Sequence, residues 1–248
     1  RNVIPSYNVN DQPISDAATL VRPANLRGLA PDHTLMLVNG KRRHRASVIT
    51  WLGNGISNGS QGPDAAAIPG AALKRIEVLR DGASAQYGSD AIAGVMNFVL
   101  NDSAEGGSLE VRYGEYKEGD GEQVTIAGNI GLPLGDNGFL NLTAEWGESD
   151  PTSRSEQRGD AQTLIDNGYQ DVPAPAMIWG RPIVNDDMKL WANFGMDLSD
   201  TLTLYGHANY NSKEVDGGFF FRNPTNRGAV YSGDGGETLL VGDLTPND

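Results

Sequence analysis

The sequence contains no cysteine among its 248 residues, so disulfide bonds and thiolate metal sites are excluded. It also lacks any run of 18 apolar residues, and we therefore predict no transmembrane helix. The uncharged stretch 46–63 is long enough, but its Gly, Ser and Asn content is typical of a loop. The first five residues lack the apolar core that a signal peptide needs.

Positive charge is scarce. The chain has 19 Lys and Arg residues against 32 Asp and Glu residues, which gives a net charge of −13 and a pI near 4.6. Nucleic-acid binding needs a basic face, so we expect no nucleic-acid partner. Glycine is abundant instead, and 32 glycines exceed the usual share of about 7%. This composition favours a turn-rich β protein, and the length fits one large domain or two ordinary ones.

The segment Leu73–Asn101 carries the most specific pattern of the chain. Two short runs in it, RIEVL and GVMNFVL, are rich in β-branched and apolar residues. The residues between them, 80–93, are polar and rich in glycine, which permits sharp turns and close backbone approach. We predict a strand, a compact turn-and-helix connector, and a second strand.

Four motifs stand in the order in which they occur in one protein family. The first two are Leu26-Arg27-Gly28 and the apolar run 34–38 followed by Asn39-Gly40. The third is Ile76-Glu77-Val78 with Arg80-Asp81-Gly82, and the fourth is Tyr87-Gly88 followed by Gly94 and Asn97. This order resembles the plug (hatch) domain of TonB-dependent outer-membrane receptors over roughly residues 5–103. Ala93 stands where the family usually has a glycine, which is a change from one small residue to another.

From residue 107 onward, apolar and polar residues alternate with a period of two, which predicts strands with one apolar and one polar face. Tight turns are predicted at 134–138 and 199–200, and long connections at 147–188 and after 212. Short turns at one end and long loops at the other are typical of transmembrane β-barrels. Alternation alone favours a soluble β-sandwich, and the plug motifs reverse that preference.

We therefore expect an α+β plug domain at residues 1–104, incomplete at its N-terminus. The first strands and extracellular loops of a truncated transmembrane β-barrel should follow at residues 105–248, as antiparallel β-strands. The known plugged transporters have many more strands, so we expect this chain to be a fragment of a larger receptor. Trp146 and Tyr210 should lie toward the same end of the sheet, near an aromatic girdle.

The only dense basic cluster, residues 41–45, directly follows the Asn39-Gly40 motif. In the family that the chain resembles, the loop at this place rises toward the extracellular vestibule. We expect the cations of this cluster to attract an anionic ligand and the ring of Trp51 to stack on it. The predicted ligand-binding residues are Arg42, Arg43, His44, Arg45, Trp51 and Asn54. The alternative is a solvated run of loop charges.

The resemblance also implies that Arg27 and Arg80 pair with carboxylates of the barrel wall, with Glu77 in the same network. Arginine suits such a lock because its planar guanidinium binds a carboxylate through two hydrogen bonds. The alternative is that both are ordinary surface arginines. The residues expected to shape the plug motifs are Gly28, Asn39, Gly40, Gly82, Tyr87, Gly88, Gly94 and Asn97.

Signals for enzyme chemistry are weak. Ser84 follows a strand as a nucleophile elbow would, but the closing glycine of that motif is missing. His33, His44 and His207 show no metal-ligand spacing. We predict no catalytic residue, no metal site and no cofactor.

The resemblance implies a receptor for TonB-energised uptake of a scarce nutrient across the outer membrane of a Gram-negative bacterium. The ligand class stays open among siderophore-bound iron, cobalamin and oligosaccharides. Expected partners are the TonB energy-transducing complex, a small extracellular ligand such as a metal chelate, and outer-membrane lipid. The N-terminal box that TonB pulls is expected to be absent from this chain. The alternatives are a soluble or surface-displayed β-rich carbohydrate-binding or adhesive module, and a hydrolase that uses Ser84.

Overall fold

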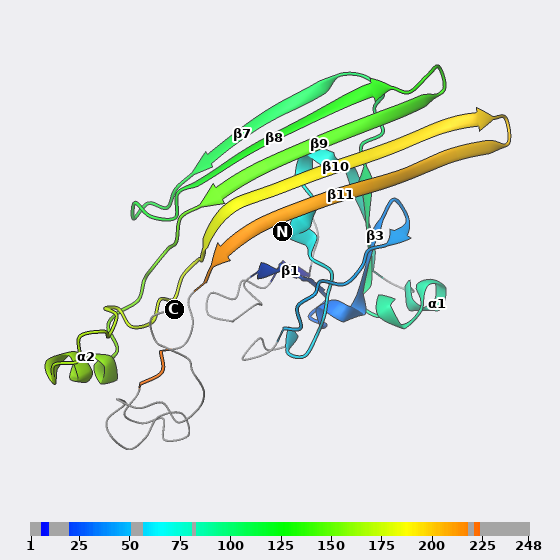
Figure 1. The fold of residues 1–248 in the computed structure, drawn as a ribbon. Coiled ribbons are helices and arrows are strands. Elements are labelled where there is room, and N and C mark those ends of the chain that lie inside the picture. Colours follow the sequence, from blue (N-terminus) through cyan, green and yellow to red (C-terminus); the bar gives the residue numbers. More distant parts are fainter. Residues whose placement is uncertain (1–5, 10–19, 51–56, 81–82, 218–220, 224–248) are drawn as a thin grey trace, which may run out of the picture.

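The computed structural model describes residues 6–9, 20–50, 57–80, 83–217 and 221–223. A five-stranded antiparallel sheet lies across a smaller unit that contains a four-stranded sheet and the short helix α1 (Figure 1). This arrangement confirms the predicted order of a mixed unit followed by antiparallel strands. Among the described residues, no helix is long and apolar enough to cross a membrane.

The smaller unit is built around two parallel strands, β3 and β6, in a sheet of order β4-β3-β6-β5. Its strands are β1 (Tyr7–Val9), β2 (Ala24–Leu26), β3 (Thr34–Val38), β4 (Lys41–Arg42), β5 (Leu73–Leu79) and β6 (Gly94–Leu100), and β1 pairs with β2 apart from the sheet. Short 3-10 turns connect them: η2 (Pro31–His33), η4 (Ala65–Ala67), η5 (Gly70–Ala72) and η6 (Ser89–Ala91).

The strand β3 is buried on both faces, as a continuous apolar run predicts for a central strand. On one face Leu35 and Leu37 pack with residues of the β5–β6 connector. On the other face Met36 and Val38 belong to a cluster that includes Trp191 of the large sheet. The two parts of the chain therefore share one hydrophobic core.

The connector between β5 and β6 consists of α1 (Ala83–Tyr87) and η6, as predicted. It ends at Gly94, whose φ of +140° is rarely adopted by a residue with a side chain. A Cβ atom at Gly94 would lie 2.5 Å from the carbonyl oxygen of Leu79 and 2.7 Å from Cδ2 of Leu26. The motif requires glycine here because two neighbouring strands pass this close to its backbone.

The large sheet has the order β11-β10-β9-β8-β7, with β7 and β11 at its edges among the described residues. Its strands are β7 (Gly107–Gly114), β8 (Gln123–Pro133), β9 (Gly138–Ser149), β10 (Ile183–Ser199) and β11 (Leu202–Asp216), and α2 (Gly159–Asp166) lies in the connection from β9 to β10. Short turns join strands at one end and the long connection at the other (Figure 1).

The connection from β9 to β10 is shorter than the predicted 147–188, because both strands extend further. At the start of β10 the alternation of apolar and polar residues is interrupted, because the pairing with β9 shifts register between Val184 and Asp187. Asp186, which lies within this bulge, has a positive φ of 47°. A bulge adds one residue to one strand, so the period of two breaks at that point.

The two faces of the large sheet differ in polarity. Trp191 and the buried side chains of Asn129, Asn141 and Asn193 belong to the face that packs on the smaller unit. The opposite face is apolar and exposes Leu109, Val111, Tyr113, Ile126, Ile130, Leu132, Leu142, Met188, Leu190, Leu204 and Tyr210. Trp146 pairs with Met188 and Tyr210 pairs with Leu190, so both aromatic residues lie toward the same end, as predicted.

Candidate functional site

The basic segment, residues 41–45, lies along the inner face of β11. At its start the Lys41 Nζ lies 5.8 Å from the ring centroid of Tyr205. Two residues later, the Arg43 Nη1 donates a hydrogen bond of 2.7 Å to the Oδ1 of Asn209. Because β11 runs toward the end of the long connections, the segment rises toward that end of the sheet (Figure 1).

Arg43 is held against the wall formed by β10 and β11. Its guanidinium lies 5.3 Å from the ring centroid of Trp191. The Trp191 indole stacks on His207 at 6.3 Å, and its Nε1 donates to the carbonyl oxygen of Ala67 at 3.0 Å. Burial lowers the pKa of Arg43, and the nearby Asp64 carboxylate partly opposes that shift.

Sequence reasoning missed Trp191. The sequence does contain one signal, because Trp191 lies on the polar face of β10, between the apolar-face residues Leu190 and Ala192. A tryptophan on a polar face needs a partner for its ring. The partners come from Arg43 and Ala67, which are far away in the sequence. The pattern of a single strand therefore does not predict them.

Arg42 and Arg45 face a carboxylate of the smaller unit. The Arg42 Nη1 contacts the Oδ2 of Asp90, and the Arg45 Nη2 lies 3.9 Å from its Oδ1. Asp90 follows the predicted Tyr87-Gly88 step, so this step positions the counter-charge of the basic segment. These exposed ion pairs contribute little stability, of order 0–1 kcal/mol.

Four of the six predicted ligand-binding residues line one small pocket of about 100 Å³. They are Arg42, Arg43, His44 and Arg45, and the same pocket is lined by the carboxylates of Asp32 and Asp90. Burial and the Arg43 charge lower the pKa of His44. Trp51 and Asn54 lie outside the described residues.

The motif residues meet at Asn97. Its Oδ1 accepts a 2.9 Å hydrogen bond from the backbone N–H of Gly40, and its Nδ2 donates one of 2.9 Å to Glu77. The Asn97 hydrogen bond and the adjacent Arg75 hold the pKa of Glu77 below its usual value. The turn after β3 has positive φ angles at Asn39 and Gly40, as have Arg27, Gly28 and Gly88 in their own turns, whereas Gly82 lies outside the described residues.

Arg27 and Arg80 lie together at the surface of the smaller unit. The Arg27 Nη1 donates a 2.9 Å hydrogen bond to the carbonyl oxygen of Arg80, and both residues are exposed. Glu77 contacts Arg75 and Asn97 within the same unit. Pairing of Arg27 and Arg80 with wall carboxylates therefore stays a prediction.

Amide contacts between the smaller unit and the wall are a second set that sequence reasoning missed, besides those of Trp191. The Asn39 Nδ2 donates to the Oδ1 of Asn193 at 3.1 Å. The Asn193 Nδ2 in turn donates to the Asn101 carbonyl oxygen at 2.9 Å. The Asn101 Nδ2 donates to the Oδ1 of Asn129 at 3.1 Å. Single asparagines in separate strands gave no signal, because the network forms only when the two sheets pack.

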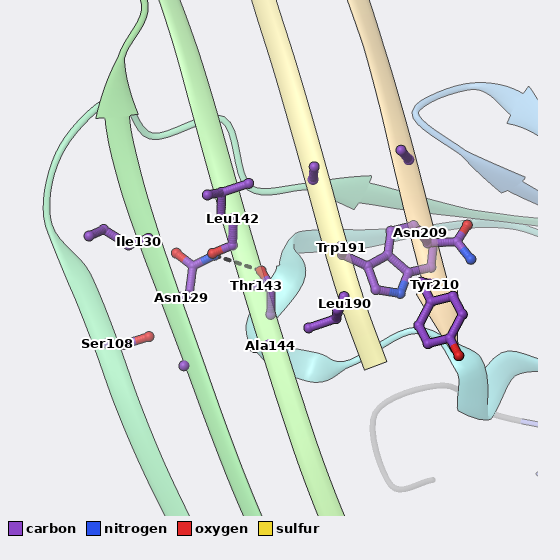
Figure 2. A pocket seen from close by; sticks show the side chains of 13 residues that line it. Ser108, Asn129, Ile130, Leu142, Thr143, Ala144, Leu190, Trp191, Asn209 and Tyr210 are labelled. Carbon is purple, nitrogen blue, oxygen red and sulfur yellow. Dashed lines mark hydrogen bonds between the residues drawn. The ribbon is translucent and has the colours of Figure 1, made fainter. Parts of the chain in front are cut away.

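A hollow of about 720 Å³ lies across the strands of the large sheet, and Trp191 and Asn209, which Arg43 contacts, are among the residues that line it. Figure 2 shows side chains that line it, among them Ile130, Leu142, Leu190 and Tyr210. These four belong to the apolar exposed face, and no predicted ligand-binding residue lines the hollow. Its size therefore gives no support for a ligand site there.

Known proteins resemble this chain in sequence. The family model described as TonB-dependent Receptor Plug Domain matches residues 1–95. The ferrienterobactin receptor of Escherichia coli is 27% identical over 244 residues, which are 93% of this chain and 28% of that receptor. The ferric enterobactin receptor of Pseudomonas aeruginosa is 30% identical over 140 residues, 54% of this chain and 18% of that receptor. The chain thus spans less than a third of these relatives.

The fold agrees with solved receptors. A crystal structure of a mutant ferric enterobactin receptor from Pseudomonas aeruginosa, in complex with enterobactin, superposes with a TM-score of 0.60 at 20% identity. The match covers 86% of this chain and 30% of that one. The matched family is a receptor family rather than a class of enzymes. Residues 1–95 therefore match the plug-domain model of TonB-dependent receptors, and the chain shares the fold of the solved receptor over 86% of its length.

Proposed function

We propose that this chain is the plug and first wall strands of an outer-membrane receptor that takes up a ferric siderophore of the enterobactin type. Support comes from the plug domain in residues 1–95 and from the names of the relatives, which are ferric enterobactin receptors. The receptor lies in the outer membrane of a Gram-negative bacterium. TonB supplies the energy for uptake.

One structural observation carries this proposal. The plug packs on the polar face of β7–β11, while the opposite face exposes a continuous set of apolar side chains. A soluble β-sandwich buries such a face against a second sheet, whereas a barrel wall turns it toward lipid. This arrangement favours the receptor over a soluble carbohydrate-binding module. It also fits a plug at residues 1–104 and a wall from residue 105 onward.

The basic segment is the proposed ligand-facing surface. It rises along β11 toward the long connections, which are the extracellular loops of the proposed receptor. Arg42 and Arg45 are exposed and present positive charge in a strongly acidic chain, and the exposed His44 lies between them in the sequence. Such a local patch attracts an anionic iron chelate. Arg43 is partly buried on Trp191. Trp51 and Asn54 belong to the same proposed set of ligand-binding residues, although they lie outside the described part of the chain.

Binding of ferric enterobactin to the full-length receptor tests this surface. Replacing Arg42, Arg43 and Arg45 with Ala should weaken binding, and the loss relative to the native receptor should be larger at low salt, because salt screens exposed charges. Lys74→Ala is the matched control, since Lys74 pairs with Asp102 at the surface of the plug. Unchanged affinity in a folded triple variant would show that the segment is only a solvated run of charges.

A further inference from the structure

A small pocket lies inside the smaller unit, between the start of β3 and the basic segment. Backbone pairing of the two continues as far as Arg43, whose N–H donates a 2.9 Å hydrogen bond to the Met36 carbonyl oxygen. The chain then turns to another neighbour, since the Ala46 N–H donates to the Gly62 carbonyl oxygen at 3.1 Å. The pocket of about 100 Å³ lies where the two segments separate, and it is lined by residues of both.

Two residues of this pocket have buried polar atoms without a hydrogen-bond partner. They are Asp32, through its Oδ1, and Thr34, through its Oγ1, and Thr34 is only 4% exposed. Within the described part of the chain, every buried side-chain polar atom that lacks a partner belongs to residues 25–34. Leaving such a group unbonded in the interior is unfavourable, and native proteins nearly always supply a partner, ordered water included.

The charges around the pocket restrict what that partner is. Arg42 and Arg45 face the Asp90 carboxylate, and Arg43 donates to the side chain of Asn209. In the described structure none of them donates to the Oδ1 of Asp32. An occupant must donate a hydrogen bond to this carboxylate, which disfavours an anion, while the three neighbouring guanidinium groups disfavour a cation.

Water meets both conditions. It is neutral, it donates to a carboxylate oxygen, and it both donates to and accepts from a hydroxyl group. One ordered water needs about 10–15 Å³, so a pocket of about 100 Å³ has room for several. Gln61 and His44 also line the pocket and supply further polar partners.

We propose that this pocket is a water-binding site, in which ordered water joins Asp32 and Thr34 to the basic segment. A rotation of these two side chains about χ1 turns their oxygens toward the pocket that the residues already line. The water continues the link between β3 and the basic segment where direct backbone pairing has ended. The site lies within the smaller unit, so it does not depend on which ligand the receptor takes.

A crystal structure of the native full-length receptor that resolves ordered water tests the proposal directly. Water oxygens should lie about 2.5–3.0 Å from the Oδ1 of Asp32 and from the Oγ1 of Thr34. Direct bonding of these two atoms by Arg45 or His44, an ion in the pocket, or a dry pocket would each overturn the proposal. This test needs no variant, so it does not depend on whether a variant folds.

The stability of Thr34→Val gives a second test, because its sign differs between a hydrated and a dry hydroxyl group. If water bonds the Oγ1 of Thr34, valine removes a hydrogen bond, and the unfolding constant of the full-length receptor in urea should rise about fivefold. If the hydroxyl is unbonded, valine removes an unsatisfied polar group, and the constant should fall.

Thr50→Val is the matched control for this measurement. Thr50 is equally buried, and its Oγ1 donates to the carbonyl oxygens of Ser57 and Ser60. Its replacement should therefore raise the unfolding constant, as we expect for Thr34→Val. A stabilised Thr34→Val receptor beside a destabilised Thr50→Val receptor would contradict the water-binding site.

Discussion

Asn97 shows how one side chain joins the motifs of the plug. It lies on β6, accepts from the backbone of Gly40 in the turn after β3, and donates to Glu77 on β5. An amide can do both because it carries a donor and an acceptor, whereas aspartate or leucine of similar size cannot. The spacing of the I-E-V, N-G and G-x-x-N elements in the sequence thus reflects one hydrogen-bonded junction.

Replacing Asn97 with Ala should raise the pKa of Glu77 toward its ordinary value of 4.5, because the largest cause of its depression is removed. Because its pKa is lowered in the native plug, the ionised Glu77 stabilises the fold at pH values above 4.5. This stabilisation is lost as the pH falls through the pKa of Glu77 in the folded state. The carboxyl carbon chemical shift of Glu77, followed against pH, measures the change. Lys74→Ala is the control, and an unaltered pKa in Asn97→Ala would contradict the assignment.

Gly94→Ala should destabilise the plug more than Gly28→Ala. Both positions have positive φ, which costs an alanine about 1–2 kcal/mol. At Gly28 no atom lies within 4 Å of the added Cβ, whereas at Gly94 the Leu79 carbonyl oxygen lies 2.5 Å from it. The clash should add about 1–3 kcal/mol. Chemical denaturation of the two variants tests this, and equal losses would show that the backbone relaxes at Gly94.

At the scale of elements, the strands of the wall are defined by their two faces. Leu142 and Ala192 pair across β9 and β10 on the apolar face, while their neighbours Thr143 and Trp191 face the plug. A shift of one residue in register would exchange these faces and place the amides outside. The buried asparagines Asn129, Asn141 and Asn193 therefore fix the register of the wall as well as the position of the plug.

An arginine on the apolar face should be costly in the full-length receptor in a bilayer. Leu142→Arg should lower the stability of the receptor by about 2–4 kcal/mol, because the charge would enter the hydrocarbon region. Asn137→Arg, in the exposed short turn between β8 and β9, is the control and should have little effect. Urea unfolding in lipid vesicles measures both, and equal stability would mean that this face does not meet lipid.

The sequence predicts single strands well and the packing contacts between them poorly. The alternation of residues 123–132 and 140–146 predicts β8 and β9, because side-chain period and strand geometry are the same property. The start of β10 lies earlier in the chain than the alternation predicts, because the bulge at Asp186 breaks the period of two there. Residues 42–45 lie together because they are consecutive in the sequence, so their cluster is predictable. The contact of Arg43 with Trp191 depends on how the two sheets pack, which the sequence does not show.

At the scale of the whole molecule, the plug and the wall form one packed body with a shared core. Trp191 of the wall contributes to the same cluster as Met36 and Met96 of the plug. The charged lock proposed for Arg27 and Arg80 would add contacts to wall strands that follow those described. This lock and the hydrogen bonds of Asn39 and Asn101 to the wall would then hold different sides of the plug.

Arg27→Ala should loosen the plug in the full-length receptor, seen as faster amide exchange in residues 26–40 and 76–94. The reason is loss of the proposed pairing with wall carboxylates. The same change in the isolated 248-residue chain should leave amide exchange nearly unchanged. Arg80→Ala should give the same two results as Arg27→Ala, faster exchange in the receptor and little change in the isolated chain. If the isolated chain loses as much protection as the receptor, these arginines belong to the internal framework of the plug and the lock is wrong.

Uptake of radioactive iron as ferric enterobactin tests the central claim most directly. A Gram-negative strain that lacks its own receptors for this siderophore should accumulate iron when it expresses the full-length protein, and only when TonB is present. A surface-located, folded protein that neither binds nor imports ferric enterobactin, in a strain where a known receptor restores uptake, would contradict the account.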